Sequence, residues 1–245
     1  MARLTWDGTG ERVYETGSSH AVLYPAITEY DSTNKTWYGK GVAWNGFTGC
    51  DESPDGADIT KKYANNGEYV SFRAAESLNF TIKAFTYPNE WKECDGRRST
   101  TAVPGFAIGQ QTRKRFGFTY QTIKGNDTQE NDYGVIYHIY YGCTASPSDR
   151  SYETVNDSPD NIEFSWECAT TPVTIPYTST LGQDLGLTND TKMVSLEIDS
   201  TTLTQAQISA LETALYGVAS PNANDAMLPD PEEIYRIIKT ATAQG

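Results

Sequence analysis

Residues 132–143, DYGVIYHIYYGC, constrain the fold more than any other stretch of the chain. In an extended strand, successive side chains point to opposite faces. One face then carries Val135, Tyr137, Ile139 and Tyr141, and the other carries Ile136, His138 and Tyr140. Both faces are apolar or aromatic, so such a strand needs a cover on each side. One cover is the protein's own core, and the second is either a helix expected at 204–216 or another copy of the protein.

Four further segments alternate apolar and polar residues with a period of two, as half-buried strands do. They are LNFTIKAFTY, RFGFTYQTI, IEFSWECAT and KMVSLEID. SHAVLYP and WYGKGVAWNGF, near the start of the chain, are also consistent with strands. The polar segment CDESPDGADITKKYANNGE is rich in turn-forming residues and predicts a long loop. We therefore expect a mainly β fold built from antiparallel strands.

The clearest helix signal is LTQAQISALETALYG. Thr204 and Gln207 have the spacing of a capping box at the start of a helix. Leu211 and Leu215 then lie on one apolar stripe, and Gly217 provides a stop. We expect this helix, over about 204–216, to lie on a sheet.

A second helix is predicted in LPDPEEIYRIIKT, where Asp230 is placed to cap the helix and Pro231 occupies its first turn. The linker VASPNANDAM, which joins the two helices, reads as flexible. We therefore expect a β domain over residues 1–217 and an arm over 218–245. The sequence leaves open whether the last helix packs on its own subunit or on a neighbour.

The formal net charge of −13 argues against a protein that holds nucleic acid or an anionic membrane, because such binding needs clustered Lys and Arg. Two short basic spots occur, Arg97-Arg98 and Arg113-Lys114-Arg115, which we expect to pair with carboxylates within or between subunits.

The first residues contain no apolar segment of the kind found in secretory signals. Since no apolar run reaches about 18 residues, no membrane-spanning helix is expected.

The four cysteines are Cys50, Cys94, Cys143 and Cys168. Their spacing contains no C-x-x-C pair and no zinc pattern, so we expect reduced, buried thiols. DESPDGAD lacks the residue order of a calcium-binding EF-hand loop, and GKGVAWNG departs from the dinucleotide fingerprint. No cofactor or metal is therefore expected.

The sequence contains no recognisable catalytic constellation. Only His20 and His138 could act as a base beside a nucleophile, and neither lies in a known catalytic motif. We interpret His138 as a packed or interface residue. Glu163 and Glu167 share one face of a strand with their backbones about 13 Å apart, at about 3.3 Å per residue. That separation exceeds the roughly 5.5 to 9.5 Å of paired glycosidase carboxylates, although Glu197 or Asp199 on another strand could come closer. This test argues against a hydrolase, and with no catalytic constellation in the sequence we do not expect an enzyme.

A set of stretches between about residues 21 and 173 resembles the major tail proteins of long-tailed, non-contractile bacteriophages, the group labelled phi13-type. They are AVLYP, YGKGVAWNG, ESPDGAD, FTYPNEWKECDG, IGQQTRKRFGFTYQTIKGND, NDYGVIYHIYYG, ASPSDRSYETVNDSPDNIEFSWE and TTPV. The helical LETALYG continues the likeness. ITEYDSTNKT, the region around LGQDLGLTND and the tail after Gly217 depart from it.

The resemblance implies two packed β-sheets flanked by a helix. It also implies six-fold rings that stack into a tube, with strands from each subunit joining a barrel around the channel for DNA. The expected partners are further copies of the chain, the tape-measure protein, and tail tip or terminator proteins, with transient, non-specific passage of DNA and no membrane. The expected location is the tail of the virion, after assembly in the cytoplasm of the bacterial host.

The resemblance also suggests roles for individual residues. The segment from about 46 to 67 corresponds to a loop that reaches the next ring, with candidates Phe47, Asp51, Glu52, Asp55, Asp58, Lys61 and Lys62. An acidic channel would repel phosphates, and the candidates that face it are Glu163, Glu167, Glu197 and Asp199. The candidates for contacts between subunits are Tyr137, His138, Tyr140, Tyr141, Arg113 and Arg115.

Two other functions stay open from the sequence. One is a β-sandwich that binds carbohydrate through exposed aromatic residues such as Trp37, Trp44 and Trp91. The other is a hydrolase that uses surface carboxylates. Rings or tubes that form with rising concentration would favour the tail protein, and a monomer that binds glycans would favour the carbohydrate-binding module. A domesticated phage-like particle would use the same kind of tube as an infectious phage.

Overall fold

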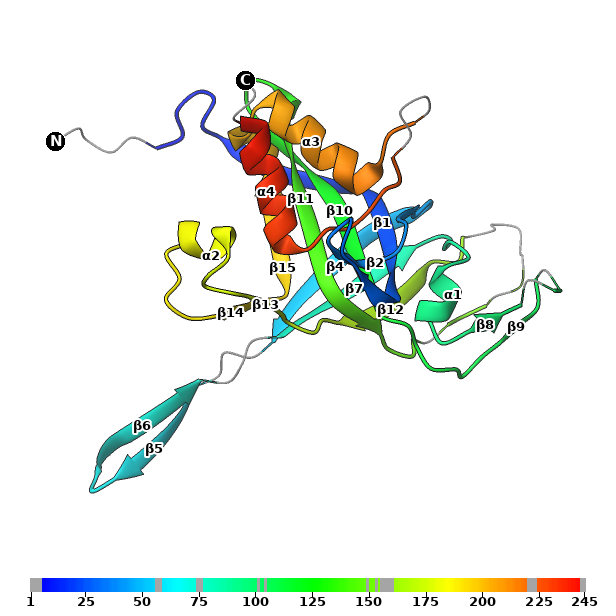
Figure 1. Ribbon diagram of the computed structural model, residues 1–245, viewed down its shortest axis with the longest axis horizontal. Coiled ribbons are helices and arrows are strands. Elements are labelled where there is room, and N and C mark those ends of the chain that lie inside the picture. Colours follow the sequence, from blue (N-terminus) through cyan, green and yellow to red (C-terminus); the bar gives the residue numbers. More distant parts are fainter. Residues whose placement is uncertain are drawn as a thin grey trace.

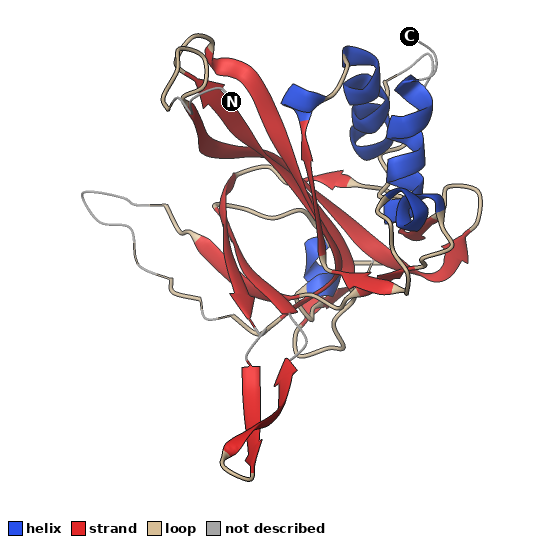
Figure 2. Ribbon diagram, turned by 90° about the vertical axis from the view of Figure 1, so that its left-hand side faces the viewer, coloured by secondary structure: helices blue, strands red, loops and turns tan. Residues whose placement is uncertain are grey.

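A computed structural model gives the fold and describes residues 6–55, 59–73, 77–100, 102–103, 105–148, 150–152, 154, 161–219 and 224–242. These residues form a nine-stranded antiparallel sheet, three two-stranded sheets and four α-helices (Figures 1 and 2). The prediction of a mainly β, antiparallel fold with a pair of helices near the C-terminus is confirmed. Asp58, one of the predicted loop residues, lies outside the described residues.

The large sheet runs in the order β2-β1-β10-β11-β12-β7-β4, with β3 paired to β1 and β15 paired to β11. Its strands are β1 (Val13–Asp31), β2 (Thr36–Tyr38), β3 (Val42–Ala43), β4 (Phe47–Asp55), β7 (Ser77–Ala84), β10 (Phe116–Asn126), β11 (Glu130–Ala145), β12 (Phe164–Ala169) and β15 (Ser195–Asp199). β11 joins β12 only through Thr144 and Ala145. The sheet therefore folds into two layers, one centred on β10 and the other on β7.

The remaining elements lie around these two layers. The small sheets pair β5 (Ile59–Ala64) with β6 (Gly67–Arg73), β8 (Arg98–Ser99) with β9 (Ala107–Ile108), and β13 (Val173–Ile175) with β14 (Thr191–Met193). The helices are α1 (Trp91–Cys94), α2 (Thr180–Asp184), α3 (Gln205–Tyr216) and α4 (Pro231–Thr242), with a 3-10 turn, η1 (Ser200–Thr202). The longer helices gather on one side of the strands in Figure 2, whereas the β5–β6 hairpin projects away from the body in Figure 1.

Aromatic side chains fill the space between the two layers. Trp44 packs against Trp91 with ring centroids 4.7 Å apart, and Phe80 stacks on Tyr140 at 4.8 Å. The apolar positions of the alternating segments LNFTIKAFTY, RFGFTYQTI and IEFSWECAT lie in this core, namely Leu78, Phe80, Ile82, Phe116, Phe118, Tyr120, Trp166 and Cys168, with Phe164 partly buried against it. Ile162, expected inward on the same alternation, is instead 39% exposed, because it precedes the first residue of β12. The described cysteines are all free; Cys94, Cys143 and Cys168 are buried and Cys50 is half-buried, close to the prediction.

The second face of β11 is covered by the chain's own helices. Tyr137, Ile139 and Tyr141 pack against Leu211 and Leu215 of α3, and Leu228 and Ile234 complete the same cluster. The Thr204–Gln207 capping box starts α3 as predicted. Of the two covers that the sequence left open, the structure uses the helix and not a second copy.

The C-terminal segment 224–242 folds back onto the first strands of the chain. The Asp230 N–H donates to the Lys35 carbonyl at 2.8 Å, and the Gly41 N–H donates to the Ala226 carbonyl at 2.8 Å. The Tyr30 hydroxyl donates to the Asp230 carboxylate at 2.8 Å, while burial raises the pKa of that carboxyl. The last helix therefore packs on its own subunit.

The described residues between 46 and 67 form strands and a tight turn, not the irregular loop that their polar composition predicted and that the resemblance assigned to contacts with the next ring. They contain β4, which pairs with β7, and most of the β5–β6 hairpin. The two strands of the hairpin are joined by Asn65 and Asn66, both with positive φ, in the two-residue turn that tight hairpins favour. Asn65-Asn66-Gly67 was therefore a signal for a hairpin turn. The sequence analysis interpreted it as part of a loop because the surrounding segment is rich in polar residues.

Candidate functional surfaces

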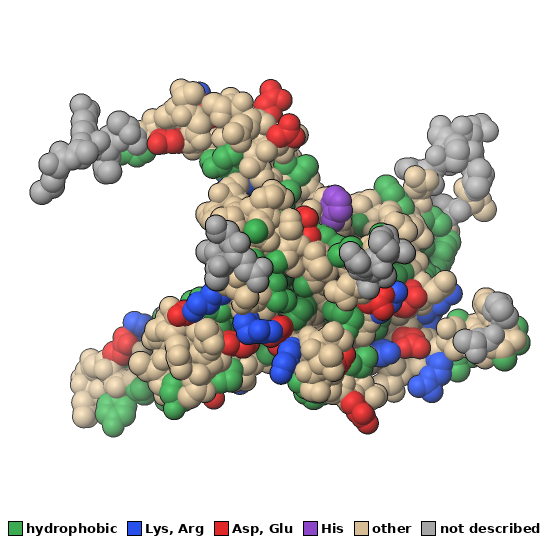
Figure 3. All heavy atoms as spheres, turned by 45° about the horizontal axis from the view of Figure 1, so that its top comes forward, with side chains coloured by type: hydrophobic (Ala, Val, Ile, Leu, Met, Phe, Trp, Pro, Cys, Tyr) green, Lys and Arg blue, Asp and Glu red, His purple; other side chains and the backbone are tan. Residues whose placement is uncertain are grey.

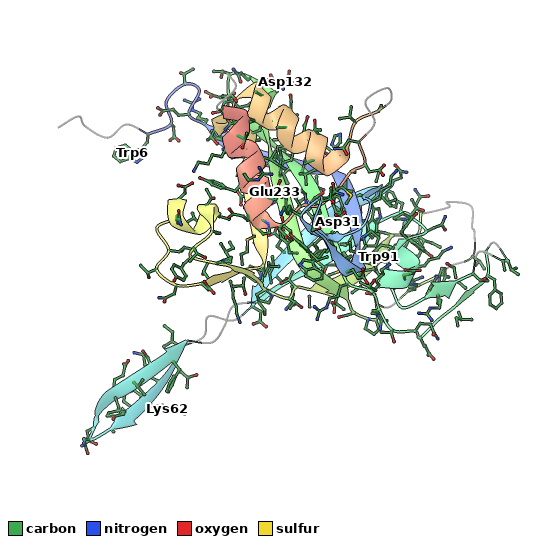
Figure 4. All side chains as sticks on the ribbon, viewed as in Figure 1. Trp6, Asp31, Lys62, Trp91, Asp132 and Glu233 are labelled. Atoms are coloured by element: carbon green, nitrogen blue, oxygen red, sulfur yellow. The ribbon has the colours of Figure 1, made fainter. Side chains whose placement is uncertain are left out.

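The apolar side chains of the β5–β6 hairpin have the highest exposed fractions of any helix or strand that the structure describes. Ile59, Tyr63, Tyr69 and Phe72 are 53%, 68%, 79% and 58% exposed. Lys61 pairs with Glu68 of the opposite strand at 2.7 Å. Lys62, labelled in Figure 4, lies on the hairpin well away from the body. A lone two-stranded hairpin is marginally stable in water, and apolar surface gathered in this way indicates a binding partner.

The residues predicted for a loop between rings fall in different places. Lys61 and Lys62 are on the hairpin, and Asp55 ends the strand that leads to it. Phe47 instead packs on the core, 6.0 Å from the Phe118 ring, so its assignment to a reaching loop was wrong. Asp51 lies on the outer face of the sheet, where it pairs with Lys83 at 2.6 Å.

Glu52 is also misplaced by the sequence prediction, because its side chain turns inward from β4. Its Oε1 accepts hydrogen bonds from the hydroxyls of Tyr120, at 2.7 Å, and Tyr140. The His138 ring stacks on Tyr120 at 4.7 Å, and its Nδ1 lies 3.9 Å from the same carboxylate oxygen. Burial raises the pKa of both tyrosine hydroxyls, so they stay protonated and act as donors. Glu52 thus fastens β4 to β10 and β11.

Three of the residues predicted for contacts between subunits are buried within the chain. Tyr137, Tyr140 and Tyr141 are each 1% exposed, because the helices cover one face of β11 and the second layer covers the other. Their hydroxyls bond within the chain, for example Tyr137 to Glu212 at 2.8 Å. The prediction was therefore wrong for these tyrosines. His138 is partly buried and its Nε2 lies 2.9 Å from the Thr122 hydroxyl.

The two basic spots of the sequence come together beside α1. The Gln111 N–H donates to the Gly96 carbonyl at 2.9 Å, and the Arg113 guanidinium lies against Gly96. Asp95 pairs with Arg97 at 3.6 Å and with Arg150. Arg115 is exposed. Part of the predicted pairing with carboxylates of the same subunit is thus present, and it leaves a local excess of positive charge.

The four acidic residues predicted to face a channel lie on two different surfaces. Glu167 and Asp51 flank Thr81 in register across β12, β7 and β4, and Glu163 accepts from the Thr48 hydroxyl at 2.7 Å nearby. Glu197 and Asp199 are instead on β15, opposite His138 and Ile136 of β11. Although burial acts to raise the pKa of Asp199, hydrogen bonds from Lys124 and Thr201 hold it below its ordinary value. Only Glu163 and Glu167 belong to the outer face of the β4–β7–β12 layer.

The aromatic residues proposed for carbohydrate binding do not form an exposed platform. Trp91 is fully buried and Trp44 is 4% exposed, since both belong to the core between the layers. Trp37 is 51% exposed and packs on Tyr30 at 5.0 Å. The prediction of Trp44 and Trp91 as exposed ligand contacts was wrong.

A comparison with models of protein families gives no match, and a search of curated proteins gives no significant match. No helix within the described part of the chain is long and apolar enough to span a membrane. Acidic and basic side chains lie interspersed over the face shown in Figure 3.

Proposed function

We propose that this protein is the subunit of a phage tail tube, which assembles from stacked six-fold rings and conducts DNA into the host cell. The observation that supports this most directly is the projecting β5–β6 hairpin with its four exposed apolar side chains. A six-residue strand extends about 20 Å, at about 3.3 Å per residue. Such an element is long enough to reach a neighbouring subunit and bury its aromatic side chains there.

The arrangement of layers supports a particular orientation of the subunit in the tube. Among the described residues, α3 and α4 cover one sheet layer, whereas the outer face of the β4–β7–β12 layer is open to solvent. That face carries Asp51, Glu163 and Glu167, with Lys83 paired to Asp51. In the proposed tube this face lines the channel, where its excess of carboxylates repels DNA phosphates and keeps the passing DNA from binding.

The partners follow from this role. Further copies of the chain form the rings and the stack, a tape-measure protein fills the growing tube, and tip and terminator proteins close its ends. The protein acts in the virion tail through assembly and not through catalysis. The six-fold symmetry and these accessory partners rest on the resemblance described for the sequence.

The deciding experiment is electron microscopy of the purified chain over a series of concentrations. We expect hollow tubes or rings that become more abundant as concentration rises. A matched variant replaces residues 59–73 by a short Gly-Ser linker, and it should give rings without tubes. If the full chain remains monomeric at high concentration and binds glycans on an array, the carbohydrate-binding module replaces this proposal.

A further inference from the structure

The chain carries a basic projection beside α1, which we call the basic arm and define as the described residues 96–100, 102–103 and 105–115. Residues 92–115 contain two acidic residues, Glu93 and Asp95, and six basic ones, namely Lys92, Arg97, Arg98, Arg113, Lys114 and Arg115. The rest of the protein is strongly acidic, since the whole chain has a net charge of −13. The charge is therefore distributed unevenly, with a positive excess at one place on the molecule.

The basic arm also exposes apolar side chains. Val103, Phe106 and Ile108 are 57%, 57% and 46% exposed. Arg98, Arg113 and Arg115 form no salt bridge with any residue in the described part of the chain. A surface that combines exposed apolar side chains with cations that form no salt bridge among the described residues is complementary to an apolar groove with an acidic border.

The molecule has such a groove between α2, β15 and α4. It has a volume of about 270 Å³, and its apolar lining includes Leu181, Leu196, Ile198, Leu203, Ile234 and Ile238. Glu197 borders it from β15, and Glu232 lies at its α2 end, where it accepts from the Thr180 and Leu181 N–H groups at 3.0 Å. Within the described residues neither glutamate forms a salt bridge. We call this hollow the α2–β15–α4 groove.

We infer that the basic arm of one copy docks in the α2–β15–α4 groove of a second copy. The two surfaces lie on opposite sides of the molecule, as α1 with β8–β9 and α2 with α4 do in Figure 1. In Figure 4, Trp91 on α1 lies to the lower right of Glu233 on α4. A contact between two different surfaces is heterologous, so it repeats from copy to copy and closes into a ring when the rotation allows. This inference rests on the proposed function only in placing the contact within a ring.

The docking is tested by cross-linking two variants that each carry one new thiol. Phe106→Cys places a thiol on the basic arm, and Thr202→Cys places one at an exposed position of the groove. The two proteins are mixed over the same series of concentrations as in the electron microscopy and oxidised with glutathione disulfide. We expect a disulfide-linked dimer that contains one copy of each variant. Phe85→Cys, a comparably exposed position outside the arm, replaces Phe106→Cys in the control and should give at least tenfold less dimer.

The outcomes separate this inference from the proposed function. Cross-linked dimers within rings or tubes support both. Rings or tubes without excess cross-linking over the control overturn the docking and leave the tail-tube proposal standing. Cross-linked dimers from a chain that never forms rings or tubes support the docking and overturn the tube. Monomers without cross-links overturn both. Glu197→Lys tests the charge contribution separately, and an unchanged yield of dimer in low salt would remove Glu197 from the contact.

Discussion

The carboxylate of Glu52 accepts a hydrogen bond from the Tyr120 hydroxyl at 2.7 Å and thereby joins β4 of one layer to β10 of the other. Tyr140 donates to the same oxygen, so a single side chain holds two hydroxyls. Since β4 leads to the β5–β6 hairpin, this contact fixes the strand from which the hairpin projects.

We expect Glu52→Ala to lower the free energy of unfolding by about 1 kcal/mol, because it leaves two tyrosine hydroxyls without their acceptor. This loss is at the low end of the range for a hydrogen-bonding group left without its partner, because the Glu52 side chain is 38% exposed and water can replace part of the contact. Glu52→Gln keeps an acceptor oxygen and should lose less. Urea unfolding followed by tyrosine and tryptophan fluorescence measures both, and equal losses would show that the hydrogen bonds are not the cause.

Gly117→Ala should destabilise the protein by about 1–3 kcal/mol through overpacking. A Cβ at this position would lie 2.2 Å from the Leu228 side chain. Shortening that partner with Leu228→Ala should make the second change less costly, so the two effects should not add. Gly109→Ala is the matched control, because a Cβ there meets nothing within 4 Å. Thermal unfolding of the four variants gives the comparison, and strict additivity would contradict the contact.

Tyr69→Ser combined with Phe72→Ser should abolish stacking of rings while leaving the subunit folded. Both side chains are exposed, so their loss should change the free energy of unfolding by no more than about 0.5 kcal/mol each. Leu185→Ser, an exposed apolar position outside the hairpin, is the control and should still form tubes. Electron microscopy together with a melting curve separates loss of assembly from loss of fold. Tubes of normal length from the double variant would exclude the hairpin as the stacking element.

Tubes built from Glu163→Lys and Glu167→Lys protein should hold short double-stranded DNA that wild-type tubes release. The change replaces repulsion of phosphates by attraction, so binding should weaken steeply as salt rises. Glu15→Lys, which changes the charge on β1 outside this face by the same amount as either single substitution, controls for net charge when compared with each single variant. Fluorescence anisotropy of labelled DNA provides the measurement. Equal DNA retention by the control tubes would show that the face with Glu163 and Glu167 does not line the channel.

Acid should destabilise the wild type more than Asp199→Asn. The folded-state pKa of Asp199 lies below its ordinary value, so the unfolded chain binds more protons than the folded one at acidic pH. The stabilisation is present above the ordinary value near 3.8 and is lost as pH falls through the lower folded-state pKa. Melting temperatures between pH 6 and 3 should therefore converge for the two proteins. Parallel curves would show that Asp199 does not contribute to acid unfolding.

Much of the fold follows from local patterns in the sequence. Alternation placed Phe80, Phe118 and Trp166 in the core, and the Thr204–Gln207 capping box set the start of α3. These signals work because strand and helix periodicities report which face is buried. The same reasoning on DYGVIYHIYYGC correctly required two covers, although it could not choose between a helix and a second copy.

The surfaces were harder to predict, because they depend on which parts of the chain meet. Trp44 and Trp91 read as possible ligand contacts, since nothing local shows that their rings pack on each other. Glu52 and Asp51 are neighbours in sequence, yet they lie on opposite faces of β4 and have different partners. Arg97 and Arg113 are brought to one place by the β8–β9 pairing and by the hydrogen bonds from Gln111 to Gly96 and from Lys114 to Glu93. The sequence prediction therefore failed for residues whose surroundings are set by contacts between distant parts of the chain.

The fold-back of the C-terminal segment also sets an order of events during translation. Leu228 and Ile234 cover the Tyr137 face of β11, and the Thr36 hydroxyl donates to the Leu228 carbonyl across most of the chain. A ribosome delivers β1, β10 and β11 well before it delivers α4. Until its last helix is synthesised, the emerging chain therefore exposes the aromatic face of β11 that this helix later covers. During that time, other nascent chains and chaperones that bind unfolded proteins can occupy the same face.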